Sequence, residues 1–226
     1  MAEYLGTFWT VLGNDLRTEW RAKETFLTML LFGTVLAFVF AFGFTNDPVT
    51  NRRILPGALW GALFFTGALG VGRTFAREAE DGAFAALILS PASRSAILLA
   101  KMVTNMVLIA LVMVLVVPLL AIMLRVDVSA ELPMLAALLA TGTVGFSVVA
   151  TPLAVMAVSA RFPEVLLPIV VFPMVTPVLI AGVNATGITL GTAIGDTPWP
   201  WMQFMWGFAI IFGILGLGLF DRMVTE

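Results

Sequence analysis

The sequence predicts an all-α integral membrane protein with six transmembrane helices preceded by an amphipathic helix. Of its 226 residues, 60% are hydrophobic and only 12% are charged, whereas soluble domains carry roughly 25% charged residues. Several apolar stretches reach the length of about 20 residues that a helix needs to cross a hydrocarbon core of ~30 Å. We therefore expect one membrane-embedded domain, over residues 25–226, after an N-terminal segment of another kind.

Residues 1–24 predict an amphipathic helix that lies in the membrane interface. A signal peptide is disfavoured, because Glu3 comes early and the basic residues follow the apolar positions. Large apolar residues recur at helical spacing, at Leu5, Phe8, Trp9, Leu12, Leu16 and Trp20, and polar residues occupy the other positions, at Asn14, Asp15, Arg17, Thr18, Glu19 and Arg21. Tryptophans and basic residues on one helix favour the interface between lipid and water. The alternative is an amphipathic helix packed on a partner subunit.

Six spans are expected at about residues 25–44, 55–72, 96–124, 132–160, 165–183 and 204–220. Prolines inside the fourth and fifth spans predict kinked helices. Lys101, in the first turns of the third span, is expected to extend its ammonium group to the interface. Residues 184–202 contain no basic residue but are rich in Gly, Thr and Trp, which is compatible with a short re-entrant or interfacial helix and equally with a surface loop carrying an aromatic belt.

The distribution of basic residues predicts the orientation. Nine of the twelve Lys and Arg residues lie in flanks on one side of the predicted spans, and only Arg52, Arg53 and Arg125 lie on the other. Because basic residues are retained in the cytoplasm, both termini and residues 73–95 are expected to be cytoplasmic.

The segment 73–95 is the longest charged stretch between spans. Phe84, Leu87 and Ile88 follow one another at helical spacing, after the Asp81–Gly82 break and before Ser90–Pro91. We interpret this pattern as a short helix whose apolar ridge fits the groove of another protein, with flanking charges that fix its register. The alternative is a solvated charge cluster next to a helix on the membrane surface.

Residues 72–91, with an acidic run and a glycine leading into an apolar run that ends in Ser-Pro, resemble the cytoplasmic loop of the haem exporter protein B family. That family supplies the permease of the ABC system for cytochrome c maturation, and the similarity extends over the whole chain. Phe84 and the alanines at 83, 85 and 86 depart from the family's leucine-rich pattern. The resemblance implies an ABC-2 type exporter-like permease whose coupling helix contacts the ATP-binding subunit through Arg77, Glu78, Glu80, Asp81, Gly82, Phe84, Leu87, Leu89, Ser90 and Pro91.

The resemblance also implies partners and a location. The expected partners are an ABC ATP-binding subunit, a haem-handling membrane subunit, a small membrane subunit and a periplasmic haem chaperone, in the bacterial inner membrane. ATP hydrolysis by the partner would drive haem export or release of the haem-loaded chaperone, with haem as the candidate substrate of the complex.

Missing residue types exclude several functions. Neither lysine follows a glycine, so the chain lacks a Walker A motif, and any ATP must be bound by a partner. We therefore expect no enzymatic activity from this chain alone. Without histidine or cysteine there is no imidazole or thiolate ligand, and we expect no cofactor or metal bound by this chain. The basic residues are scattered between apolar spans, which argues against nucleic-acid binding.

Two other classes of function stay open at this stage. An ion-coupled secondary transporter generally needs acidic residues inside the membrane, but all fourteen Asp and Glu residues fall in the termini or in links between the predicted spans. A membrane scaffold that transports nothing would need no coupling segment.

Overall fold

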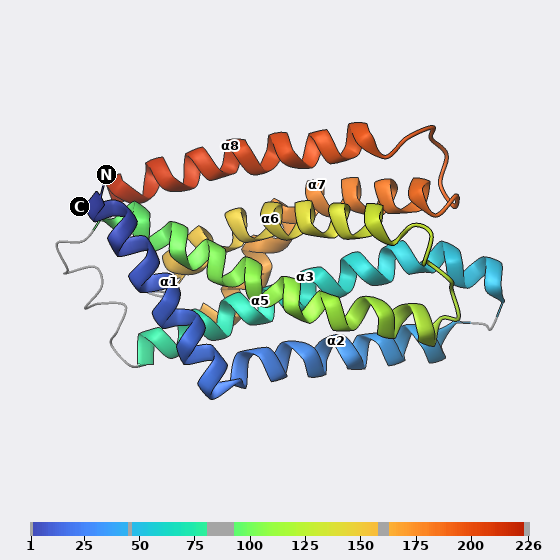
Figure 1. The fold of residues 1–226 in the computed structure, drawn as a ribbon, viewed down its shortest axis with the longest axis horizontal. Coiled ribbons are helices and arrows are strands. Elements are labelled where there is room, and N and C mark those ends of the chain that lie inside the picture. Colours follow the sequence, from blue (N-terminus) through green and yellow to red (C-terminus); the bar gives the residue numbers. More distant parts are fainter. Residues whose placement is uncertain (1, 45–46, 81–92, 158–162, 224–226) are drawn as a thin grey trace.

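The computed structural model describes residues 2–44, 47–80, 93–157 and 163–223, and this part of the chain forms seven helices. Six of them are long and apolar enough to cross a membrane, and they run side by side along the bundle (Figure 1). They are α2 (Glu24–Gly43), α3 (Pro48–Glu80), α5 (Arg94–Met123), α6 (Leu132–Ala157), α7 (Pro163–Thr189) and α8 (Trp199–Met223). The predicted all-α membrane fold is confirmed.

The first helix, α1 (Ala2–Ala22), lies across one end of this bundle instead of along it (Figure 1). The start of α1 and the end of α8 lie at the same end, which we name the termini end. The links 124–131 and 190–198 lie at the other end, which we name the link end. One residue, Lys23, joins α1 to α2 in the left-handed conformation, with φ of 56°. The change of direction between the two helices is made there.

The second span is longer than the sequence predicts. It starts at Pro48, because proline suits the first turn of a helix and the Asp47 carboxylate accepts hydrogen bonds from the Thr50 amide (2.9 Å) and hydroxyl (2.7 Å). At its other end, residues 73–80, which the sequence assigned to a loop, continue α3 without a break. Helix formers such as Ala and Glu fill this stretch, and α3 continues to Glu80, the last residue described before 93.

The region 184–202 does not form a separate re-entrant helix. Its first six residues extend α7, residues 190–198 form an irregular link, and α8 starts at Trp199. The Leu190 and Thr192 amides donate hydrogen bonds to the Thr186 and Gly187 carbonyls, which ends α7 in tight turns. Only residues 190–198 are therefore a loop, and Trp199 and Trp201 belong to the first turn of α8.

The core is centred on the indole of Trp60 in α3, whose side chain is 1% exposed. Its Nε1 donates a hydrogen bond of 2.9 Å to the Thr186 hydroxyl of α7. A Cβ atom at Gly142 in α6 or at Gly182 in α7 would overlap the ring. Small residues at these two positions thus let three helices close on one indole, as in other helical membrane proteins.

Candidate functional site

The predicted coupling segment begins in the last turns of α3 and precedes α5, and the end of α3 and the start of α5 both lie at the termini end (Figure 1). Of its implied contact residues, Arg77, Glu78 and Glu80 belong to the last turns of α3. The others, Asp81, Gly82, Phe84, Leu87, Leu89, Ser90 and Pro91, lie outside the described residues. The structure does describe the end of α3 and the start of α5, which flank this segment and which we name its two stems. It also shows the contacts that hold these stems in place.

The stem formed by α5 is joined to α1 by a buried ion pair. Lys101 Nζ lies 2.9 Å from Asp15 Oδ2, and the two side chains are 3% and 15% exposed. Lys101 was expected to extend to the interface, and in the structure its ammonium group extends to α1 and is buried there. Because α1 covers the first turns of α5, the ammonium group meets a carboxylate of the same chain before it reaches water.

The face of α1 that packs on the bundle carries Leu12 and Glu19, which are 6% and 5% exposed, together with Asp15. The Glu19 carboxylate accepts a hydrogen bond of 3.0 Å from the Phe26 amide in the first turn of α2. Sequence periodicity had placed both acidic residues on the polar side of the helix. Periodicity within one helix does not show which groups of other helices these two carboxylates contact.

The remaining surface of α1 divides into an apolar and a basic part. Leu5, Trp9 and Trp20 are 51%, 66% and 74% exposed, Phe8 and Leu16 are half-buried, and Arg17 and Arg21 are exposed. An exposed tryptophan flank beside a basic flank suits a helix at the level of the lipid headgroups. One face of the helix packs on its own bundle, and the exposed surface can meet either lipid or a partner subunit, so both interpretations stay open.

The stem formed by α3 is anchored up to residue 75. Phe75 is 2% exposed, and the buried Thr74 hydroxyl donates a hydrogen bond of 2.9 Å to the Gly70 carbonyl. Arg73 Nη1 lies 3.0 Å from Glu24 Oε1 at the start of α2, in a largely exposed pair. Such exposed pairs contribute about 0–1 kcal/mol, so the buried ring of Phe75 is the stronger attachment.

The link end is closed by polar side chains of α3. Arg52 donates hydrogen bonds through Nε to the Leu190 carbonyl (2.9 Å) and through Nη1 to the Asp127 carbonyl (3.1 Å), and its Nη2 pairs with the Glu131 carboxylate. The buried Asn51 amide donates to the Leu124 carbonyl at 2.8 Å. From the sequence, Arg52 was only a basic residue near a link. In the structure it joins both long links of this end to one helix.

The described residues hold no cluster of three or more His, Cys, Asp or Glu side chains that could bind a metal ion. Within the six long helices of the described ranges, Asp and Glu occur only in the first or last turns. The membrane-spanning middle of the bundle is thus apolar, apart from hydroxyl and amide side chains such as the buried pair of Asn105 and Thr151 (3.0 Å).

Comparison with known proteins identifies this architecture. The family model described as CcmB protein matches residues 6–220, from the first turns of α1 to the last turns of α8. The chain belongs to the CcmB protein family. The amphipathic first helix and all six spans are thus part of what the family model describes, and the resemblance seen in residues 72–91 extends to a match over nearly the whole chain.

Individual relatives agree with this assignment. The protein named Heme exporter protein B of Rhodobacter capsulatus is 31% identical over 76% of this chain and 78% of the relative. The protein of the same name from Paracoccus denitrificans is 30% identical over 77% and 80%, and that from Pseudomonas aeruginosa is 26% identical over 81% and 82%. Together with the six spans, these similarities make the chain a multi-pass membrane protein of this family.

Proposed function

We propose that this chain is the membrane-spanning permease subunit of an ABC-type haem exporter that serves cytochrome c maturation. The observation that carries the proposal is the family match over residues 6–220, with relatives named Heme exporter protein B. The absence of a Walker A motif from the sequence means that a separate subunit must hydrolyse ATP. A haem-handling membrane subunit, a small membrane subunit and a periplasmic haem chaperone complete the proposed complex.

Residues 77–91 dock the ATP-binding subunit in this proposal. The framework around the two stems supports it, because a displacement of the segment is passed on to α3 and α5 together. From α5 it reaches α1 through the Asp15–Lys101 pair, and from α3 it reaches α2 through the Arg73–Glu24 pair. ATP binding in the partner therefore shifts spans against one another, and that shift drives either haem export or release of the haem-loaded chaperone.

Docking is tested by purifying the tagged chain in detergent from cells that also produce the ATP-binding subunit. The intact chain should retain that subunit, whereas Leu87→Arg and Asp81→Arg should reduce retention at least about tenfold, as when an interface anchor or a rim charge is lost. Arg53→Glu changes the charge of an exposed residue at the link end and serves as the matched control. Equal retention by all four proteins, or none by the intact chain, would show that this segment does not dock an ATPase.

The proposed orientation places both termini and the coupling segment in the cytoplasm of a cell with an inner membrane. The chain contains no cysteine, so single cysteines report sidedness without background. Arg17 on α1 and Arg53 on α3 are exposed residues at opposite ends of the bundle. Each is replaced by cysteine in a separate variant. In intact spheroplasts, an impermeant maleimide should label position 53 and leave position 17 unlabelled until the membrane is opened. The reverse pattern would overturn the orientation.

Reconstitution of the complex distinguishes haem export from release of the haem-loaded chaperone. With the complete complex in proteoliposomes, haem accumulation in the lumen on addition of ATP indicates export, and loss of haem-loaded chaperone from the complex without accumulation indicates release. Accumulation that needs an ion gradient and no ATP-binding subunit would instead identify an ion-coupled carrier and contradict the proposal.

A further inference from the structure

The fold sorts the charged residues of α1 by sign. In the sequence they alternate as Asp15, Arg17, Glu19 and Arg21, so this stretch of the helix has no net charge. In the structure the two carboxylates, one turn apart, face the bundle at 15% and 5% exposure and have partners there. The two arginines, also one turn apart, are exposed on the outer side. The surface that α1 presents outward is therefore positive although the segment is neutral.

Three cations make up this outer surface. Lys23, exposed at the turn into α2, follows Arg17 and Arg21, and we name these three residues the basic flank. No ion pair among the described residues involves any of the three. The next acidic residue, Glu24, already pairs with Arg73. The basic flank thus leaves three positive charges for groups outside the described part of the chain.

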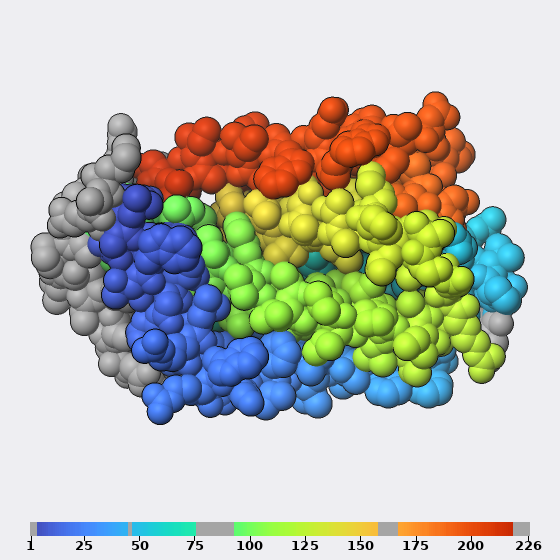
Figure 2. All heavy atoms as spheres, in the orientation of Figure 1, coloured from blue at the N-terminus to red at the C-terminus, as the bar shows by residue number. Residues whose placement is uncertain are grey.

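The position of α1 places the basic flank at the membrane surface. The helix lies across the termini end of the bundle (Figure 1), and its atoms, dark blue in Figure 2, lie on the surface of the molecule there. Only Lys23 separates α1 from Glu24, where the first span begins. Because the link is a single residue, α1 lies where the span enters the bilayer. Trp9 and Trp20, which are 66% and 74% exposed, have side chains that favour the level of the headgroups.

We propose that the basic flank binds the headgroups of anionic phospholipids, so that these lipids are enriched around α1. A leaflet that contains such lipids has a negative surface potential, which favours association by roughly fivefold for each Lys or Arg close to it. Zwitterionic headgroups have no net charge and lack this attraction. The proposal needs only that α1 lies at the membrane surface, so it does not depend on the proposed transport function.

Energy transfer from α1 to labelled lipids measures this enrichment. The chain contains no cysteine, so Asn14→Cys, at an exposed position of α1, accepts a single donor fluorophore. The full chain is reconstituted in vesicles of phosphatidylethanolamine and phosphatidylglycerol, with a trace of one or the other carrying an acceptor on its acyl chain. The association constant at α1 should be at least about tenfold higher for phosphatidylglycerol than for phosphatidylethanolamine, since three cations contribute.

Variants of the basic flank test which residues cause the preference. Each single replacement of Arg17, Arg21 or Lys23 by Gln should lower it about fivefold, and the triple replacement should abolish it. Arg17→Lys should retain it, because the charge is kept. In 1 M salt, where the Debye length is about 3 Å, the preference of the wild-type chain should fall to that of the triple variant.

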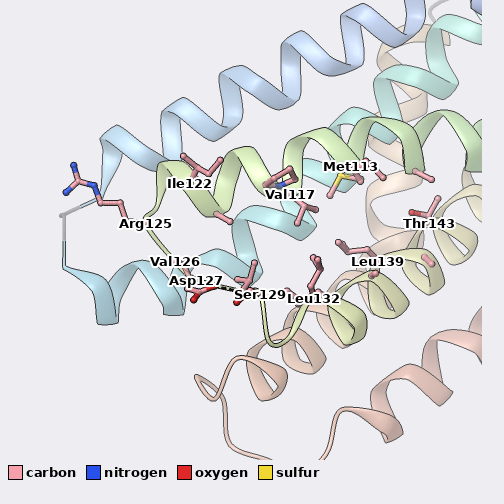
Figure 3. Close-up of a pocket in the computed structure, with 18 residues that line it drawn as sticks. Met113, Val117, Ile122, Arg125, Val126, Asp127, Ser129, Leu132, Leu139 and Thr143 are labelled. Atoms are coloured by element: carbon pink, nitrogen blue, oxygen red, sulfur yellow. Dashed lines mark hydrogen bonds between the residues drawn. The ribbon is translucent and has the colours of Figure 1, made fainter.

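The matched control lies at the opposite end of the bundle. A groove of about 860 Å³ between α5 and α6 is lined by apolar side chains such as Met113 and Leu139, and Arg125 lies at its link end (Figure 3). Arg125→Gln also removes one exposed arginine, but far from the basic flank, and should leave the transfer from α1 unchanged.

Three results would overturn the proposal: equal transfer to the two lipids in the wild-type chain, a triple variant that keeps the preference, or an equal loss in Arg125→Gln. A protein partner is distinguished with the same triple variant. If its lipid preference is unchanged and it retains less of the ATP-binding subunit in detergent, the basic flank binds protein and the proposal is wrong. Size-exclusion chromatography and circular dichroism show whether each variant is folded.

Discussion

Removing one partner of the buried Asp15–Lys101 pair should strongly destabilise the chain. Lys101→Met keeps the length of the side chain but removes its charge, which leaves the Asp15 carboxylate facing α5 at only 15% exposure. At 2.9 Å and an effective dielectric constant of about 20, the two charges attract by roughly 6 kcal/mol, most of which offsets their desolvation. The loss on removing one partner is then about 3 kcal/mol.

The double variant Asp15→Asn with Lys101→Met should lose only about 1 kcal/mol, since it removes both charges of this pair together. The coupling energy of the double-mutant cycle should therefore be about 2 kcal/mol or more. The measurement is equilibrium unfolding of the purified chain in mixed micelles with increasing sodium dodecyl sulfate, followed by circular dichroism.

The chain offers its own control, because its other lysine, Lys23, is exposed at the turn between α1 and α2. Lys23→Met should change the free energy of unfolding by less than about 0.5 kcal/mol. If the two single variants at positions 15 and 101 are simply additive, or if Lys101→Met behaves like Lys23→Met, then the pair does not hold α1 on the bundle.

Three further predictions concern the core and the link end. Gly182→Ala should destabilise the chain by about 1–3 kcal/mol because the new Cβ overlaps the Trp60 indole. Gly57→Ala is the control, because Gly57 has open space around it, and it should not destabilise the chain. The same unfolding titration compares the two variants. The hydrogen bonds that Asp47 accepts lower its pKa below the usual 3.8, so its stabilising effect is complete above pH 3.8 and is lost as the pH falls through the lower value of the folded state. The difference in melting temperature between wild type and Asp47→Asn should thus vanish in strong acid, and a constant difference would contradict this. Arg52→Gln should speed hydrogen exchange in residues 124–131 and 190–198 while leaving α1 unchanged, because its bonds to both links are lost.

The sequence predicts the number and order of the spans because the bilayer demands continuous apolar stretches, and those are visible without tertiary information. Span ends are less visible. The stretch 73–80 is charged, which indicates its position outside the hydrocarbon, but charge does not distinguish a loop from a helix that continues into water. The residues implied for the coupling helix were found through resemblance, and most of them lie outside the described residues.

Contacts between distant segments could not be predicted. The partner of Lys101 lies in another helix, and amphipathic periodicity assigned Asp15 to the polar side of α1. The groove between α5 and α6 gave no signal either, since its lining is as apolar as the lipid-facing surface around it. One signal was available for the core: glycines in five of the six predicted spans are compatible with close helix packing. It could not show that Gly142 and Gly182 enclose the same indole.

That shared indole restricts which motions a transport cycle can use. Trp60 is enclosed by α6 and α7 and bonded to Thr186, so α3 cannot slide past either helix without withdrawing a large side chain from a close-packed site. A force applied where α3 leaves the membrane is consequently delivered to all three helices as a single rigid body. Relative displacement is left to the outer helices, of which α8 has a spanning window that is only 11% buried.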